Sequence, residues 1–436
     1  MMGNDTIHAG VNKMKFKELT IQEYENFATQ CVGRFYLNSS KMIELKKNNG
    51  WETYYVGVVD DEDHVLAAAG FSKVPVMRFY HYAYAQRGIL CDFNDHALTT
   101  FFTEELKKYI ASHDMAYMRM DPYVEYQQLD EDGQVVKDGW NNQAMIDFLA
   151  SIGYEHQGFF KGWPEDRQVR YMVVMDLDDL SEEDIVANYE PNTRRTIVRA
   201  KKMGVKTKEL DLNHLEPFME LMDYTAKKRN FTDMGLEAYQ NQMRALGSDH
   251  AKVIVSYLDT AEVHEKNTKD LADIQKEQEK TNAILAKNPN SKKMNRRKKE
   301  ELERIAQIER WEKTTNELEA KYGKEIILSG AYFVIYDGEM DYISSGSYDE
   351  LRKYSGPYVI QDQAILTAKR LGLHRYNFTG TSGIFNEDGP DYGVFLFKKH
   401  LGGRPIELMG DFDLVCDPKM MKKIHRMQSV THILRK

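Results

Sequence analysis

The sequence presents one order of secondary-structure signals twice, once in each half. In both halves a short strand leads into a helix, a strand–turn–strand follows, and a second helix leads into another strand. The strand pair of the second half turns at Asp337-Gly338, a dipeptide typical of tight hairpins. Near the end of each half, Phe148 and Phe397 both stand five residues before a glycine. A chain with such a repeat is expected to fold as two similar α/β units.

This order of elements resembles the acyltransferase (GNAT-type) fold of the acetyl-CoA-using family, in two tandem copies. It makes Leu149 and Lys398 equivalent, so that a charge in the second copy replaces an apolar residue in the first. A lysine there could neutralise an oxyanion, and the second unit is therefore expected to hold the chemistry. Local sequence alone favours a different interpretation, because Lys398 follows a strand-like apolar run (residues 394–397) and would be a surface lysine at a helix start.

A charged segment, residues 259–323, interrupts the second copy. Lys, Glu, Gln and Asn dominate residues 262–287 and 293–322, and the sequence Asn-Pro-Asn-Ser between them is typical of a turn. Apolar residues recur three, four and seven apart in both parts, which predicts a helical hairpin packed as an antiparallel coiled coil, ended by Gly323. The expected apolar stripes are Val263, Leu271, Ile274, Ile284 and Leu285 on the first helix, and Leu302, Ile305, Ile308, Trp311, Leu318 and Tyr322 on the second.

Basic residues gather at two places in a chain whose net charge is −9. That charge argues against a protein that coats nucleic acid, so any RNA contact requires a local basic stripe. One candidate is the tip of the hairpin, and another is a helix on which Arg195, Arg199 and Lys202 share a face that could hold a diphosphate or RNA backbone. The tip carries Lys292, Lys293, Arg296, Arg297, Lys298 and Lys299, of which the first four are the candidate RNA contacts. Solvated basic faces remain the alternative for both, as do anionic lipid for the tip and dimerisation for the hairpin.

Several enzyme classes lack support in the sequence. There is no P-loop, Rossmann glycine fingerprint, HExxH motif or Gly-x-Ser-x-Gly elbow. The loop that cradles the pyrophosphate of acetyl-CoA is also missing, which disfavours an ordinary acetyl-CoA N-acyltransferase but leaves it as an alternative. Neither the histidines nor the three cysteines, Cys31, Cys91 and Cys416, show metal-ligand or redox spacing. We therefore expect no metal and no cofactor, and a cytoplasmic protein.

The patterns divide the chain into five parts. They are a disordered leader (residues 1–13, with Met14 a possible start), a first unit (14–165), a second unit (166–258 plus 324–415), the hairpin arm (259–323) and a basic tail (416–436). The tail mixes Met and Ile with Lys and Arg. It could touch the inner face of a membrane or pack on the body as a helix.

Several segments, taken in order, resemble the Fem aminoacyltransferases of Gram-positive bacteria from Met14 to about Val415. These segments are residues 73–77 (KVPVM), 87–88 (RG), 120–123 (MDPY), 158–162 (GFFKG), 170–171 (RY), 375–378 (RYNF) with Gly380, and 397–399 (FKK). The resemblance implies transfer of Ala, Ser or Gly from aminoacyl-tRNA to a stem-peptide side-chain amine in a peptidoglycan precursor, lipid II or UDP-MurNAc-pentapeptide. It also implies a homodimer or a related Fem-type protein as a possible partner.

The resemblance also assigns roles to individual residues. Lys398 matches the family's essential lysine, thought to steady the oxyanion, and Asp121 matches an aspartate in the substrate cleft. Lys46 and Arg194 match basic positions that bind the phosphates or sugar end of the precursor, with Arg195 beside them. The remaining cleft positions are aromatic or amide-bearing: Tyr342, Phe378 and Gln86.

One position departs from the family pattern. Met234 stands where the family often has an arginine, so a phosphate contact there must be lost or supplied by Arg229 or Arg195. This departure is the only support for another alternative, a catalytically inactive protein that binds tRNA or the cell-wall machinery. The presence of Lys398, Asp121 and Phe378 argues against it.

Overall fold

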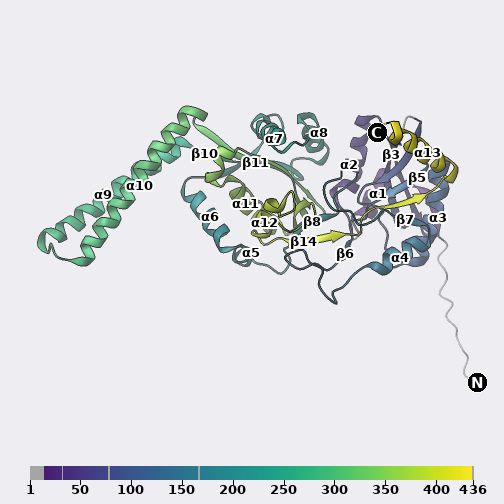
Figure 1. Cartoon of the computed structure of the whole chain (residues 1–436), viewed down its shortest axis with the longest axis horizontal. Coiled ribbons are helices and arrows are strands. Elements are labelled where there is room, and N and C mark those ends of the chain that lie inside the picture. The colour runs from purple at the N-terminus through teal and green to yellow at the C-terminus, as the bar shows by residue number, and fades with distance from the viewer. Residues whose placement is uncertain (1–13, 32, 77–78, 165–166, 435–436) are drawn as a thin grey trace, which may run out of the picture.

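The computed structural model describes residues 14–31, 33–76, 79–164 and 167–434, with side chains described as far as Met427. The predicted leader, residues 1–13, and Met77 lie outside the described residues. Two β-sheets with their helices make up the body, and a pair of long helices projects from the second sheet (Figure 1). The predicted fold class, two α/β units with an inserted helical arm, is confirmed.

Seven strands form the first sheet, in the order β1-β2-β3-β4-β5-β15-β7. Helices α3 (His96–Ser112) and α4 (Gln143–Ser151) bury Phe102 and Leu149 against one face, and α1 (Ile21–Ala28) and α2 (Ser40–Glu44) cover the other. The strands are β1 Lys15–Glu18, β2 Glu52–Val59, β3 Val65–Val76, β4 Tyr80–Ala85, β5 Tyr117–Met120, β7 Tyr154–His156 and β15 Phe412–Val415.

Eight strands form the second sheet, in the order β6-β14-β8-β13-β12-β11-β10-β9. Alternate residues of its strands face opposite ways: Val173 joins a core under one set of helices, whereas Val174 joins a core under the other. The first set is α5 (Glu182–Asn188), α6 (Pro191–Lys202), α11 (Gly356–Arg370) and α12 (Tyr392–Lys399), and the second is α7 (Glu216–Arg229) and α8 (Leu236–Leu246). The strands are β6 Glu125–Gln127, β8 Tyr171–Asp176, β9 Lys206–Leu210, β10 Ala251–Asp259, β11 Glu325–Tyr336, β12 Glu339–Ser347, β13 Arg375–Thr381 and β14 Arg404–Leu408.

The two sheets share one topology, as the repeat predicts. Each described sheet has one parallel pair, β4 with β5 and β12 with β13, and each pair spans only three residues per strand. The helices α4 and α12 both lead through a glycine in the left-handed region, Gly153 (φ 103°) and Gly402 (φ 83°), towards the last strand of the repeat, β7 and β14. Leu149 and Lys398 are therefore structurally equivalent.

The sheets do not divide at the predicted unit boundaries. Strand β15, assigned from the sequence to the second unit, lies between β5 and β7 in the first sheet. Strand β6, assigned to the first unit, pairs with β14 of the second. Strand β8 occupies in the second sheet the place that β15 has in the first. Local periodicity marks a strand but does not determine its partner, which depends on long-range packing.

The arm consists of α9 (Thr260–Lys287) and α10 (Lys292–Tyr322), joined by the predicted turn and ended by Gly323 with φ 83°. It leaves and re-enters the sheet at one point, because Asp259 of β10 pairs with Glu325 of β11. The seam between its helices is more polar than predicted. Ile284 and Leu302 are exposed, whereas Thr281 and Glu301 are buried and joined by a 2.8 Å hydrogen bond from the hydroxyl to the carboxylate. Polar groups that satisfy each other replace part of the apolar stripe.

The tail forms helix α13 (Pro418–Leu434), which packs on the first unit through the buried Ile424 against Ala116 and Tyr117. This contact supports the packed-helix interpretation of its described side chains. None of the described helices combines the length and apolar character needed to cross a bilayer.

Candidate active site

Lys398 lies in the last turn of α12 and is only 3% exposed. The strand-like interpretation of residues 394–397 is wrong, because these residues belong to the same helix. A short apolar run does not distinguish a strand from a buried helix. The surface-lysine interpretation is wrong for the same reason: the helix turns Lys398 inward, beneath the second sheet.

A bulge in β13 receives the amine of Lys398. Its Nζ donates hydrogen bonds to the backbone oxygens of Gly380 (2.6 Å) and Thr379 (3.2 Å). Pairing between β13 and β8 shifts register between Asn377 and Gly380, and Thr379 adopts φ 58°. A β-branched residue in the left-handed region is strained. The backbone oxygens of Thr379 and Gly380 lie at this irregularity and accept the hydrogen bonds of Lys398; bulges are frequent beside active sites.

Burial lowers the pKa of Lys398 to about 7, against the opposing effect of the Asp391 carboxylate. Asp391 directly precedes α12, and its carboxylate accepts hydrogen bonds from Thr381 Oγ1 (3.0 Å) and the Ser382 backbone N–H (2.9 Å). A buried lysine whose pKa is shifted in this way is a candidate functional residue.

The two aromatic positions lie beside Lys398. Thr379 Oγ1 donates a 2.7 Å hydrogen bond to the backbone oxygen of Tyr342, so the residue that holds Lys398 also holds β12. The ring of Tyr342 is partly buried, with its centroid 5.6 Å from that of Phe333. Phe378 is fully buried in the same core. Because none of its surface is exposed, it does not line an open cleft, contrary to its predicted position.

Asp121 follows β5, where the two units meet, and is 2% exposed. Its Oδ1 accepts a 2.9 Å hydrogen bond from the backbone N–H of Arg87, and its Oδ2 lies 3.3 Å from an Arg87 guanidinium nitrogen. Burial raises the pKa of Asp121 to about 7, although Arg87 opposes this rise. Among the described residues, no hydrogen bond or ion pair joins Asp121 to Lys398, and each is held by other partners.

A polar chain nevertheless leads from Lys398 towards the Asp121 region. Thr379 N–H donates to Asn377 Oδ1 (2.7 Å), and the Asn377 amide donates to the Tyr123 hydroxyl (3.2 Å). That hydroxyl donates to Glu339 Oε1 (2.8 Å). Burial raises the pKa of Glu339 and of its neighbour Asp341. Glu339 and Asp341 alternate on one face of a predicted strand, a sequence signal that points to this cluster although neither residue was among the predicted site residues.

Lys46 and Gln86, two further predicted substrate-binding residues, lie outside the hydrogen-bonded neighbourhood of Lys398. Lys46 belongs to a short 3-10 helix, Leu45–Asn49, beside α8, and its Nζ is 6.0 Å from the Trp51 ring centroid. Arg194 is on α6, across the second sheet from α8. The structure thus does not bring Lys46 and Arg194 together. Gln86 follows β4, partly buried, next to Arg87 and therefore near Asp121.

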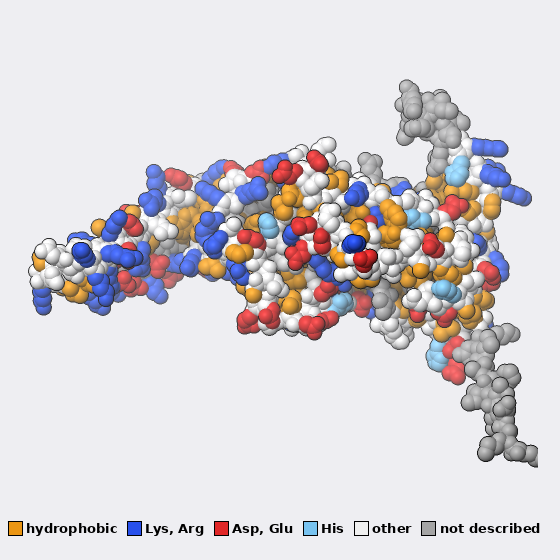
Figure 2. Space-filling model, turned by 60° about the horizontal axis from the view of Figure 1, so that its bottom comes forward, with side chains coloured by type: hydrophobic (Ala, Val, Ile, Leu, Met, Phe, Trp, Pro, Cys, Tyr) orange, Lys and Arg blue, Asp and Glu red, His pale blue; other side chains and the backbone are white. Residues whose placement is uncertain are grey.

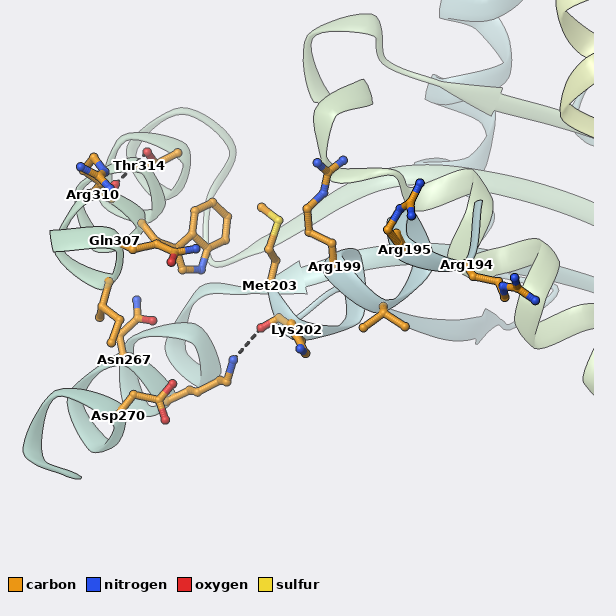
Figure 3. Close-up of a pocket in the computed structure, with 14 residues that line it drawn as sticks. Arg194, Arg195, Arg199, Lys202, Met203, Asn267, Asp270, Gln307, Arg310 and Thr314 are labelled. Atoms are coloured by element: carbon orange, nitrogen blue, oxygen red, sulfur yellow. Dashed lines mark hydrogen bonds between the residues drawn. The ribbon is translucent and has the colours of Figure 1, made fainter. Parts of the chain in front are cut away.

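Arg194 and Arg195 line a groove of about 830 Å³ between α6 and the base of the arm, which we call the arm-base groove (Figure 3). Nη1 of Arg194 donates to the Ala187 oxygen (2.7 Å), and the Arg195 guanidinium donates to Asn192. Arg195 cannot replace a contact at Met234, because Met234 lies between α7 and α8 on the other face of the sheet. Of the two arginines suggested, only Arg229 lies on that face.

The predicted RNA-contacting residues at the tip lie at the far end of the arm (Figure 1). Lys292 and Lys293 are exposed. The other two are paired within their own helix: Arg296 with Glu300 and Arg297 with Glu301, each at 2.9 Å.

No group of three or more His, Cys, Asp or Glu side chains in the described part of the chain is arranged to hold a metal ion. Two repeated units of acyltransferase topology, with a buried lysine held against bulge carbonyls in one of them, are features of an acyl-group transferase.

Comparisons with known proteins define the class further. The FemAB family model matches residues 19–428. Aminoacyltransferase FemA of Staphylococcus epidermidis is 33% identical over 402 residues, covering 92% of this chain and 95% of that protein. Its Staphylococcus aureus counterpart is 32% identical over 399 residues, covering 92% and 94%. The crystal structure of FemX has the same fold, with a TM-score of 0.81 at 23% identity over 94% of this chain and 99% of that one. The chain belongs to the FemAB family and is an aminoacyltransferase.

Proposed function

We propose that the enzyme transfers alanine, serine or glycine from aminoacyl-tRNA to the stem-peptide side-chain amine of a peptidoglycan precursor, building an interpeptide bridge. The acceptor is lipid II or UDP-MurNAc-pentapeptide. The observation that carries this proposal is the buried amine of Lys398, whose pKa is lowered to about 7 and which two bulge carbonyls hold in place. The full-length match to the FemA relatives supports the aminoacyl group as the one transferred.

The reaction is aminolysis of an activated ester, so the enzyme acts mainly by positioning the reactants. The acceptor nitrogen attacks the ester carbon, an oxyanion forms, and the bond to the ribose oxygen then breaks. A lysine ammonium has three N–H donors. The carbonyls of Thr379 and Gly380 take two of them, which orients the third for the oxyanion. A donor of this kind lowers the barrier by about 3–4 kcal/mol.

The attacking ammonium must lose a proton before it can act as a nucleophile. Asp121 is the proposed acceptor, because burial raises its pKa to about 7 and its Oδ2 has no well-formed hydrogen bond in the structure. The leaving ribose oxygen gains a proton as the ester bond breaks. This role requires the two units to bring Asp121 to the same substrate carbon that Lys398 contacts, because the nitrogen and the oxyanion are bonded to that one carbon.

Product mass spectrometry tests the proposal. The enzyme is incubated with each acceptor and either a mixed pool of charged tRNA or acetyl-CoA. A mass gain of one amino-acid residue, only with charged tRNA, is expected. An acetylated acceptor would instead identify an acetyl-CoA N-acyltransferase. Binding of tRNA without product from either donor would identify the inactive binding protein.

A further inference from the structure

The arm-base groove concentrates positive charge in an acidic protein. Figure 2 shows Lys and Arg side chains gathered along the arm and where it meets the body. Three helices contribute six cationic side chains to the groove, against one carboxylate, Asp270. The six are Arg194, Arg195, Arg199 and Lys202 from α6, Lys266 from α9 and Arg310 from α10. Since the whole chain carries a net charge of −9, composition alone does not produce this cluster.

The charges of the groove are not neutralised by the protein. Within the part of the chain that the structure describes, none of the six cations forms a salt bridge with a carboxylate. Arg194 and Lys266 instead donate to the backbone oxygens of Ala187 and Lys202. The tip differs, because Arg296, Arg297 and Lys299 each face a glutamate one helical turn away. The base of the arm is therefore the better anion site, although the basic residues of the tip are closer together in the sequence.

The shape of the groove favours a polymer over a flat surface. Its apolar floor is formed by Val198, Met203, Ile308 and Trp311. The Trp311 ring lies 5.8 Å from the Tyr354 ring, so the floor is continuous with the core of the body. Figure 3 shows the α6 side chains one after another along the helix, with those of α9 and α10 beyond the end of the row that Lys202 and Met203 form. A flat lipid surface fits such a concavity less well than a sugar–phosphate backbone, which presents both anionic and apolar groups to it.

The groove is connected to the active site by α6. The backbone N–H of Glu190, which caps α6, donates a 2.9 Å hydrogen bond to the oxygen of His400, two residues after Lys398. From there α6 runs for 12 residues, about 18 Å at 1.5 Å per residue. Along it, Arg195, Arg199 and Lys202 recur at four and three residues, as the sequence predicted. A basic row thus leads from the Lys398 end of the unit to the arm.

We propose that the arm-base groove, and not the tip of the arm, binds the double-helical stem of the donor RNA next to its aminoacylated end. This inference rests on the proposed function, in which the donor is aminoacyl-tRNA. With the 3′ end at Lys398, the phosphates of the stem lie along α6, and the base of the arm closes the other side of the groove. The arm then contributes to donor recognition through Lys266, Arg310 and Trp311.

Two triple variants, each with three fewer positive charges, distinguish RNA binding at the arm-base groove from RNA binding at the tip of the arm. Arg199→Ala/Lys202→Ala/Arg310→Ala removes cations from both walls of the groove, and Lys292→Ala/Lys293→Ala/Arg296→Ala removes the same number from the tip. Binding of uncharged tRNA is measured over a salt series. The groove variant should bind at least tenfold more weakly, and its slope of log K against log salt should fall by about three. A larger loss in the tip variant overturns the proposal.

A short donor distinguishes failure of this proposal from failure of the proposed function. An aminoacylated dinucleotide carries the reactive ester but no stem. The groove variant should lose at least tenfold in kcat/KM with charged tRNA and less than twofold with the dinucleotide. If the wild-type enzyme uses neither donor, the proposed function fails. If wild type is active and the variant matches it with charged tRNA, or loses equally with both donors, the groove does not bind the stem.

A membrane is the competing occupant. Flotation of both triple variants with phosphatidylglycerol vesicles should show no difference between them. If the groove variant loses vesicle binding and keeps tRNA binding, the groove is a lipid site and the proposal is wrong.

Discussion

The two units share a topology but differ at one buried position. In the first, α4 places Leu149, fully buried, in an apolar core, and the neighbouring strands β5 and β15 pair in regular register. In the second, α12 places Lys398 there, and β13 is bulged against β8. The second unit thus differs from the first in two coupled features, a buried amine and a strand irregularity that provides its hydrogen-bond partners.

The largest expected effect comes from placing the lysine in the wrong unit. Leu149→Lys would bury an amine where no bulge offers carbonyls, and the free energy of unfolding should fall by about 5 kcal/mol. Urea unfolding measures this loss. Ala150→Lys, at the exposed neighbouring position of the same helix, is the matched control and should change stability little. Equal effects of the two variants would show that burial at position 149 is not the deciding difference.

Removing the lysine from the second unit should abolish most of the activity. Lys398→Met loses the oxyanion donor, and transfer should fall by about 10²–10³-fold, or about 3–4 kcal/mol of barrier, while precursor binding persists. Lys399→Met is the control, because Lys399 pairs with Asp132 outside the site. Single-turnover transfer and acceptor binding are measured in parallel. Transfer by Lys398→Met at near wild-type rate would remove Lys398 from the mechanism.

The sequence predicted the parts of this comparison that depend on local signals. Periodicity was sufficient for the repeat, the equivalence of Leu149 and Lys398, and the two helices of the arm. Periodicity did not predict that β15 pairs in the first sheet, because strand pairing is determined by long-range packing. The bulge at Thr379 was not predicted either. A threonine with positive φ has no sequence signal in a run such as Arg-Tyr-Asn-Phe-Thr-Gly.

Prediction of the site was limited in the same way. The basic face of α6 was anticipated, but not that the arm would complete a groove over it. Family resemblance supplied both Lys398 and Asp121, but their separation depends on how the two units dock. The burial of Glu339, Asp341 and Arg87 at that junction is a tertiary property.

The ionisation of Lys398 should be measurable in stability. Its pKa is lowered from 10.5 to about 7, so above pH 7 the unfolded chain binds one more proton than the folded one. Stability of the wild type should therefore rise with pH from 7 to 9, relative to Lys398→Met, by about 2–3 kcal/mol. Unfolding at both pH values, in both proteins, measures the difference. Parallel pH dependences would show that the amine is not desolvated in the folded state.

The smallest effect is a change in kcat/KM of about tenfold per pH unit, and it depends on which of the two buried groups acts as the acid and which as the base. If Lys398 acts as a cation it must be protonated, and if Asp121 acts as a base it must be ionised; burial brings both pKa values to about 7. The profile of kcat/KM should then be bell-shaped with a maximum near pH 7.

Two variants assign the limbs of that profile. A bell-shaped profile with the same maximum would also arise if Lys398 had to be neutral and Asp121 protonated, because both groups have a pKa of about 7. Asp121→Asn should remove the acid limb if Asp121 is the base, and Lys398→Arg, which stays charged above pH 7, should flatten the alkaline limb of the remaining activity. If Asp121→Asn removes the alkaline limb instead, Asp121 donates the proton and neutral Lys398 accepts it. The bulge carbonyls would then serve to orient an amine base.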